Sequence, residues 1–166
     1  IVLAHTASSY TLGSEAESKL IAQLEAESGS RVMTAAGAVL KALQHLDVQK
    51  VALATPYAES TSRQGKSFLQ HHGLDVVGYS RLENVRNIYE ETPERAYRLA
   101  RQADTPEAEA LFISGTGLPT LPVIEMLERD LGKPVFSSAT AMMWLALRLA
   151  GVGESISGYG QLLTLP

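Results

Sequence analysis

The sequence predicts an α/β protein with mainly parallel sheets in a three-layer α/β/α arrangement. First, short apolar runs alternate with longer segments of helical periodicity along all 166 residues. Second, the apolar runs are about 4–6 residues long and do not alternate strictly, which is typical of strands covered on both faces. Third, 45% of the residues are hydrophobic, enough to fill a core in a chain of this length.

Runs rich in Val, Leu, Ile and Ala mark the expected strands. Each run lies between turn residues or helical segments and is too short to be a buried helix. Residues 31–34 are a candidate for a further short strand. The main strands are expected at residues 1–5, 50–54, 74–79, 110–114 and 134–137.

Periodic apolar positions and end signals mark the expected helices. Leu20, Ile21 and Leu24 fall on one face of the first. Thr92 and Pro93 form a start signal, an N-cap residue followed by proline at the first helical position. Helices are expected at residues 14–27, 35–46, 61–72, 93–103, 121–131 and 139–150, and the glycine-rich tail 153–166 is expected to be a loop with a brief extended piece.

Composition excludes several classes of protein. The absence of cysteine rules out disulfide frameworks, zinc–thiolate and iron–sulfur sites and thiol nucleophiles. The net charge of −4 is a poor match for nucleic acid. No apolar stretch reaches the ~20 residues that span a bilayer, and no two histidines have zinc-ligand spacing on one helical face. We expect a cytoplasmic protein without metal, nucleic-acid or membrane partners; its oligomeric state, a homo-oligomer included, is open.

Small hydroxyl residues and glycines follow the carboxyl ends of four expected strands, where open parallel α/β folds bind ligands. Small side chains let backbone N–H groups reach an anion, and neutral donors suit a carboxylate or a developing enolate oxygen. The alternative is that these are ordinary turn residues. The four ends carry His5, Thr6 and Ala7; Thr55 and Tyr57; Ser114, Gly115, Thr116 and Gly117; and Ser137, Ser138 and Thr140.

Two aromatic side chains at these ends could take part in chemistry. His5 ends the first expected strand and is either a packing histidine or a general acid/base. Tyr57 is either a core aromatic or a hydroxyl donor into the pocket. The polar segment 81–91 is either a surface connection or a lid that brings Asn84 or Arg86 over the pocket.

In these segments the chain resembles the aspartate/glutamate racemase superfamily, specifically its maleate isomerase and arylmalonate decarboxylase branch. The similarity covers nearly the whole chain in the right order. The matching stretches are residues 51–57 (VALATPY), 110–118 (ALFISGTGL), 132–139 (GKPVFSSA) and 159–162 (YGQL).

The resemblance implies two similar, flavodoxin-like α/β lobes with the active site in the cleft between them. Residues 47–141 would form the second lobe, and residues 1–46 with 142–166 would belong to the first. The family's opening strand–helix units have no counterpart here, and the chain starts abruptly on Ile1 without a methionine. A longer polypeptide is therefore an open alternative.

The resemblance also implies cofactor-independent chemistry through an enolate-like intermediate. The family uses cysteines at two pocket positions, which match His5 and Gly115, and neither is cysteine here. Thr6, Tyr57 and Thr116 resemble the oxyanion-binding set. Asn84 resembles the isomerases' substrate-binding asparagine.

The missing cysteines favour decarboxylation of a malonate-type acid, which needs an apolar pocket, an oxyanion hole and one proton donor. Isomerisation through a cysteine adduct and two-base racemisation both need groups that are absent. Two alternatives stay open: a carboxylate-binding protein without catalysis, and a different lyase chemistry. The predicted catalytic residues are His5, Tyr57 and Gly115, and the predicted substrate-binding residues are Thr6, Ala7, Thr55, Asn84, Ser114, Thr116 and Gly117, with no cofactor and no metal.

Overall fold

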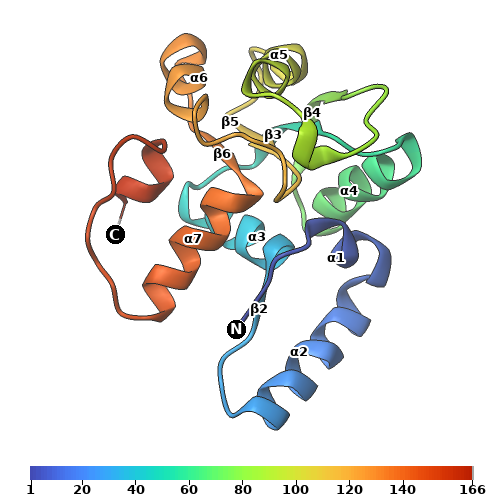
Figure 1. The fold of residues 1–166 in the computed structure, drawn as a ribbon, viewed down its shortest axis with the longest axis vertical. Coiled ribbons are helices and arrows are strands. Elements are labelled where there is room, and N and C mark those ends of the chain that lie inside the picture. The colour runs from blue at the N-terminus through green and yellow to red at the C-terminus, as the bar shows by residue number, and fades with distance from the viewer. Residues whose placement is uncertain (166) are drawn as a thin grey trace.

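A four-stranded parallel sheet forms the centre of the computed structural model, which describes residues 1–165 (Figure 1). Its spatial order is β4-β3-β5-β6, so β3, the first of these four strands along the chain, lies inside the sheet and not at its edge. Crossover segments containing helices join the strands, as parallel pairing requires. The strands are β3 (Lys50–Thr55), β4 (Asp75–Arg81), β5 (Ala110–Ile113) and β6 (Val135–Ser137).

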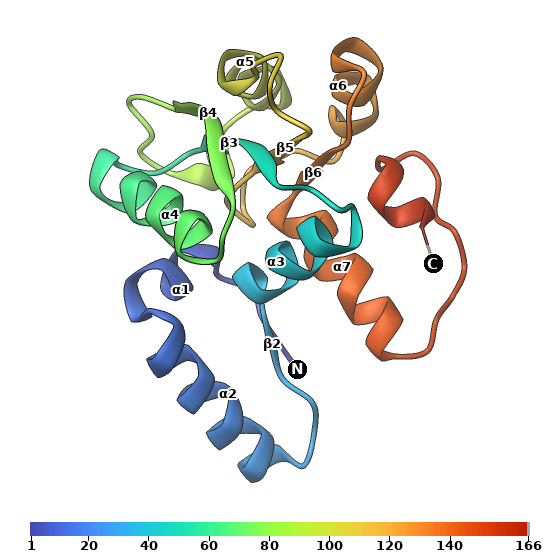
Figure 2. The same cartoon turned by 180° about the vertical axis from the view of Figure 1, so that it is seen from behind.

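Helices cover both faces of this sheet, which confirms the predicted three-layer α/β/α class (Figure 2). Alternate strand residues enter opposite layers: Val51 and Leu53 pack into one buried cluster, and Ala52 and Ala54 into the other. The first layer contains α3 (Ala35–His45), α4 (Glu59–His71) and α7 (Ser138–Leu149), and the second contains α5 (Pro93–Ala103) and α6 (Ile124–Leu131).

A second, two-stranded parallel sheet lies beside the first. It pairs β1 (Val2–Leu3) with β2 (Met33–Thr34), so the short strand considered at residues 31–34 is present. Between these strands come α1 (Thr6–Leu12) and α2 (Ser14–Ser28), and α2 projects from the rest of the molecule in both views (Figures 1 and 2). Helix α3 packs along α7 and thereby joins the two sheets.

The structure corrects the sequence prediction at both ends of the chain. The first strand is shorter than expected, and residues 6–12 form helix α1 instead of a strand-end loop. This helix is stabilised by tertiary packing of Tyr10 against Tyr57 and Phe68, which its seven residues do not reveal as a periodic pattern.

In the tail the expected extended piece is a 3-10 helix, η2 (Gln161–Thr164). Burial of Leu162 and Leu163 selects this conformation. Pro166, the last residue of the predicted tail, lies outside the described residues.

Smaller differences concern element boundaries. Helix α6 begins at Ile124 and not at residue 121, because a turn containing Pro122 precedes it. Helix α4 begins at Glu59, two residues earlier than expected, and β4 continues to Arg81. Within residues 1–165 no helix is both long and apolar enough to cross a membrane.

Candidate active site

A cluster of buried hydroxyl groups lies at the carboxyl ends of β1, β5 and β6. The Thr6 hydroxyl donates to the Ser138 Oγ at 2.9 Å, and the backbone N–H of Gly115 donates to the same oxygen at 3.2 Å. The Ser114 Oγ and the Tyr10 hydroxyl share a hydrogen bond of 2.9 Å. Residues more than a hundred positions apart in the chain therefore meet at one point.

Tyr57, which follows β3, joins this cluster. Burial raises the pKa of its hydroxyl, and hydrogen bonding with Ser114 and Thr6 offsets only part of that rise. Burial likewise raises the pKa of Tyr10 far above its ordinary value. Both phenols are therefore protonated at neutral pH, so Tyr57 has an O–H that it can donate to an anion.

Gly115 occupies a position that no larger residue fits without a shift. Its φ is +100°, a left-handed conformation that L side chains rarely adopt. A Cβ there would lie 2.7 Å from the Pro56 Cγ and 2.9 Å from the Ile88 Cδ1. The wall around Gly115 is therefore apolar.

The two residues after Gly115 continue the site. The Thr116 hydroxyl donates to the Ala4 carbonyl at 3.0 Å, which ties the loop after β5 to the end of β1. A Cβ on Gly117 would lie 2.6 Å from the Tyr89 ring, which is 77% exposed and lies against this glycine.

Three predicted site residues are oriented differently from the cluster. The exposed His5 ring shares a 2.6 Å hydrogen bond with Ser8 and lines a cavity of about 380 Å³ that Gly115 does not line. The Thr55 hydroxyl is 2.6 Å from the Ser62 Oγ. Asn84 is exposed on the connection after β4, with a φ of 58°.

Ala7 is half-buried and packs against the core, so it contributes shape to the region and no polar side chain. The structure thus brings together Thr6, Tyr57, Ser114, Gly115 and Thr116 from the predicted set.

Three residues of this region were not among the predicted catalytic and substrate-binding residues. Ser138 lies at a strand end that the sequence singled out, but its role as a shared acceptor depends on Thr6, 132 residues away. Tyr10 is placed by the unpredicted helix α1. No pattern in the sequence around Tyr89 indicates that its ring lies against Gly117.

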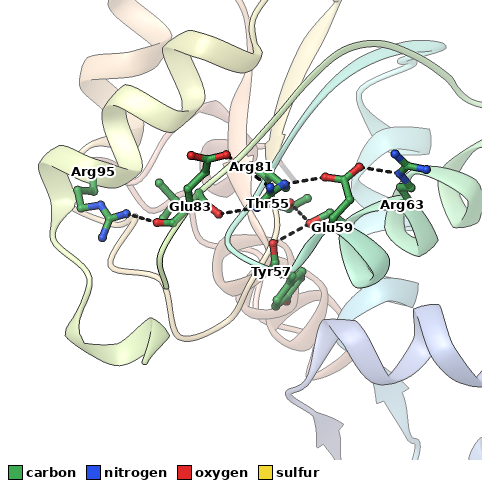
Figure 3. Close-up of polar contacts among 9 residues, drawn as sticks. Thr55, Tyr57, Glu59, Arg63, Arg81, Glu83 and Arg95 are labelled. Atoms are coloured by element: carbon green, nitrogen blue, oxygen red, sulfur yellow. Dashed lines mark hydrogen bonds and ion pairs between the residues drawn. The ribbon is translucent and has the colours of Figure 1, made fainter. Parts of the chain in front are cut away.

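Charged residues flank the cluster on its β4 side. Glu59, at the start of α4, pairs with Arg63 and with Arg81, both at 2.6 Å, and Arg95 reaches Glu83 (Figure 3). These pairs hold the ends of β3 and β4 in place next to Thr55 and Tyr57. Among residues 1–165, no group of three or more His, Asp or Glu side chains is arranged to hold a metal ion.

The family model that describes arylmalonate decarboxylase matches residues 1–163. The chain belongs to the arylmalonate decarboxylase family. This agrees with the resemblance to the maleate isomerase and arylmalonate decarboxylase branch.

Relatives of both kinds are similar to the chain. It is 36% identical to a maleate isomerase from Nocardia farcinica, in a match covering 86% of this chain and 59% of the relative. It is 32% identical to an arylmalonate decarboxylase from Bordetella bronchiseptica, covering 98% of this chain and 70% of the relative. The chain thus spans less than two thirds of the first relative's length and slightly more than two thirds of the second's.

Solved structures of the family share the fold. A Nocardia farcinica maleate cis-trans isomerase bound to TRIS superposes with a TM-score of 0.91 at 29% identity, covering 99% of this chain and 70% of that chain. An arylmalonate decarboxylase superposes with a TM-score of 0.87 at 32% identity, covering 98% of this chain and 72% of that chain.

Proposed function

We propose that this protein is a cofactor-independent enzyme that decarboxylates a small malonate-type acid through an enolate-like intermediate. The convergence of uncharged donors beside Gly115 carries this proposal: Thr6 and the Gly115 N–H meet at the Ser138 hydroxyl, and the Tyr57 hydroxyl hydrogen-bonds with Thr6. Donors fixed in this way stabilise negative charge that develops on an oxygen, and they need no reorganisation during the reaction.

The chemistry balances with one proton donor. The bond between the α-carbon and one carboxylate breaks, CO₂ leaves, and the electron pair forms the enediolate of the remaining carboxyl group. Tyr57 and the Thr6–Ser138 pair would bind the enediolate oxygens. One proton transferred to the α-carbon then completes a monocarboxylic acid.

We infer that the His5 imidazole supplies this proton. Its backbone lies between Ala4, whose carbonyl accepts from Thr116, and Thr6, which is bonded to Ser138. The ring would turn away from Ser8 to reach the α-carbon, and its exposure leaves room for that rotation.

The substrate class follows from the walls of the site. Pro56 and Ile88 border Gly115, and the Tyr89 ring covers Gly117. These side chains suit an apolar or aromatic α-substituent. A covalent cysteine route is disfavoured, because this chain has no cysteine and no free space at Gly115. One Nocardia farcinica isomerase mutant was solved with a covalently bound succinylcysteine intermediate, so the proposed route differs from that enzyme's.

The division into lobes is also a proposal. Residues 47–141 contain the whole four-stranded sheet, while β1, β2, α3 and the part of α7 from residue 142 onward would belong to the other lobe. The cytoplasmic location stays a prediction from the sequence, which leaves the oligomeric state, a homo-oligomer included, open.

The test is to assay CO₂ release and α-proton exchange on a panel of 2-substituted malonates, with maleate included. Tyr57→Phe should lower kcat about 10²–10³-fold, the usual effect of removing one oxyanion-hole donor. His5→Ala should abolish protonation. Tyr159→Phe and His71→Ala change exposed residues of the same types and should keep full activity.

Three results would decide against the proposal. Binding of malonates without turnover in the wild type would mean a carboxylate-binding protein. Turnover of maleate alone would mean an isomerase. Full activity of both Tyr57→Phe and His5→Ala would show that another site carries the reaction.

A further inference from the structure

A single arginine holds both ends of the connection between β4 and α5. Arg95, in the first turn of α5, has its Nη1 2.6 Å from the Oε2 of Glu91, and its Nη2 donates to the Glu83 carbonyl at 2.8 Å (Figure 3 shows the second contact). The Glu91 side chain is only 6% exposed, so this ion pair is largely shielded from water. One guanidinium therefore joins two points eight residues apart.

Between these points the connection carries two side chains over the candidate active site. Ile88 faces Gly115 and Tyr89 faces Gly117, so closely that neither glycine has room for a Cβ. Both residues belong to a short 3-10 helix, η1 (Ile88–Glu90), in which the Asn87 side chain caps the Tyr89 N–H. We call the segment 84–90 the roof.

The shape of the roof is determined locally, but its position is not. Asn87 accepts from the Tyr89 N–H at 3.1 Å and donates to Glu90 at 2.9 Å, contacts that travel with the segment wherever it lies. The Tyr89 ring is mostly exposed, so its contact with Gly117 contributes little apolar burial. Ile88 is half-buried and packs against the core cluster under α5, and anchoring at the ends adds to this contact in keeping the roof closed.

The end of β4 has anchors of its own, and its Arg81 also reaches the Glu83 carboxylate at 3.5 Å. Arg81 pairs with Glu59 at 2.6 Å, and the Leu82 N–H donates to the Thr55 carbonyl at 2.9 Å, so the strand is tied to its neighbours without Arg95. Removing Arg95 should consequently release the roof and leave the sheet intact.

We propose that Arg95 is a positioning residue that keeps the roof closed, so that Ile88 covers Gly115 and Tyr89 covers Gly117. Its effect on catalysis rests on the proposed function, because the roof would hold the substrate's α-substituent and exclude water. Its effect on the roof itself does not depend on that function. Replacing the arginine would leave the Glu91 carboxylate buried beside no cation, which favours the open segment.

The test follows tryptic cleavage after Arg86, an exposed residue within the roof, by mass spectrometry. Arg95→Ala should speed this cleavage at least about tenfold, because two charge-assisted contacts are lost. Arg95→Lys, which keeps a cation beside Glu91 but cannot span both contacts, should be intermediate. Arg98→Ala is the matched control, since Arg98 lies on the same helix, is exposed and, among residues 1–165, hydrogen-bonds to the Glu94 carbonyl of its own helix and not to the roof.

Urea unfolding and kinetics separate the outcomes. Faster cleavage that depends only weakly on urea below the unfolding transition, which is the signature of a local opening, would support the proposal, as would a kcat/KM lowered about tenfold in an active enzyme. Unchanged cleavage, cleavage whose urea dependence equals that of global unfolding, or undiminished kcat/KM with an open roof would overturn it. If the wild type turns over no malonate, the proposed function fails, while cleavage and deuterium exchange of residues 83–91 still decide the role of Arg95. Should Arg95→Ala not fold, Arg95→Lys and Glu91→Gln provide the same comparison.

Discussion

Replacing Gly115 with alanine should destabilise the protein strongly, for two reasons that add. Holding an L-residue at a φ of +100° costs about 1–2 kcal/mol. The new methyl would also lie 2.7 Å from the Pro56 Cγ and 2.9 Å from the Ile88 Cδ1, well inside the normal carbon–carbon separation. Overpacking of this kind costs a further ~1–3 kcal/mol. We therefore expect the free energy of unfolding to fall by about 2–5 kcal/mol.

Two other glycines separate these contributions in urea unfolding. Gly132→Ala, at a φ of +67° with no atom within 4 Å of the added Cβ, should lose only the backbone part, about 1–2 kcal/mol. Gly117→Ala, whose φ is not positive, meets only the exposed Tyr89 ring, which can swing away, and should lose less than about 1 kcal/mol. If Gly115→Ala lost no more stability than Gly132→Ala, the close apolar wall inferred around Gly115 would be wrong.

Two further predictions concern buried polar groups. Ser114→Ala leaves the buried Tyr10 hydroxyl without its partner and should lower the free energy of unfolding by about 1–3 kcal/mol. Adding Tyr10→Phe should recover much of that loss. A double-mutant cycle measured by urea unfolding that shows no coupling between the two residues would contradict the shared hydrogen bond. Burial raises the pKa of Glu128, although its carboxylate accepts from the Val135 and Gln161 N–H groups, so the folded state binds this proton more tightly than the unfolded state. The contribution of Glu128 to the free energy of unfolding is then most favourable below its unfolded pKa and is lost as pH rises through the folded pKa. From about pH 4.5 to pH 7 the free energy of unfolding, measured in urea, should therefore fall less in Glu128→Gln than in the wild type. An equal fall in the two proteins would contradict the raised pKa.

The central sheet could be predicted from the sequence because its strands are buried on both faces. Residues such as Leu53 and Phe112 have no polar face to present, so each strand appears as an unbroken apolar run between helical segments. Helix α1 could not be predicted in this way. Its conformation depends on Tyr10 packing against Phe68 and Tyr57, partners that lie about fifty residues along the chain.

For the candidate site, too, the sequence predicted one part and only the structure decided the other. That ligands bind at the carboxyl ends of parallel strands is a property of topology, and it was enough to select Thr6, Tyr57, Ser114 and Gly115. The direction of each side chain was not accessible, because it depends on which partner takes the hydrogen bond. Thr55 turns to Ser62 and His5 to Ser8, while Thr6 turns to Ser138 in the cluster.

The sequence by itself therefore determined the fold class, the family and the uncharged, cysteine-free chemistry of the strand ends, because these depend on residue types and their order. Only the tertiary structure decided that the Ser138 oxygen is shared by Thr6 and Gly115, that Pro56 and Ile88 enclose Gly115, and that Arg95 holds the roof. Those features are contacts between distant segments. They arise when the packed core sets the strand ends and loops against one another, and no local pattern of residues encodes that geometry.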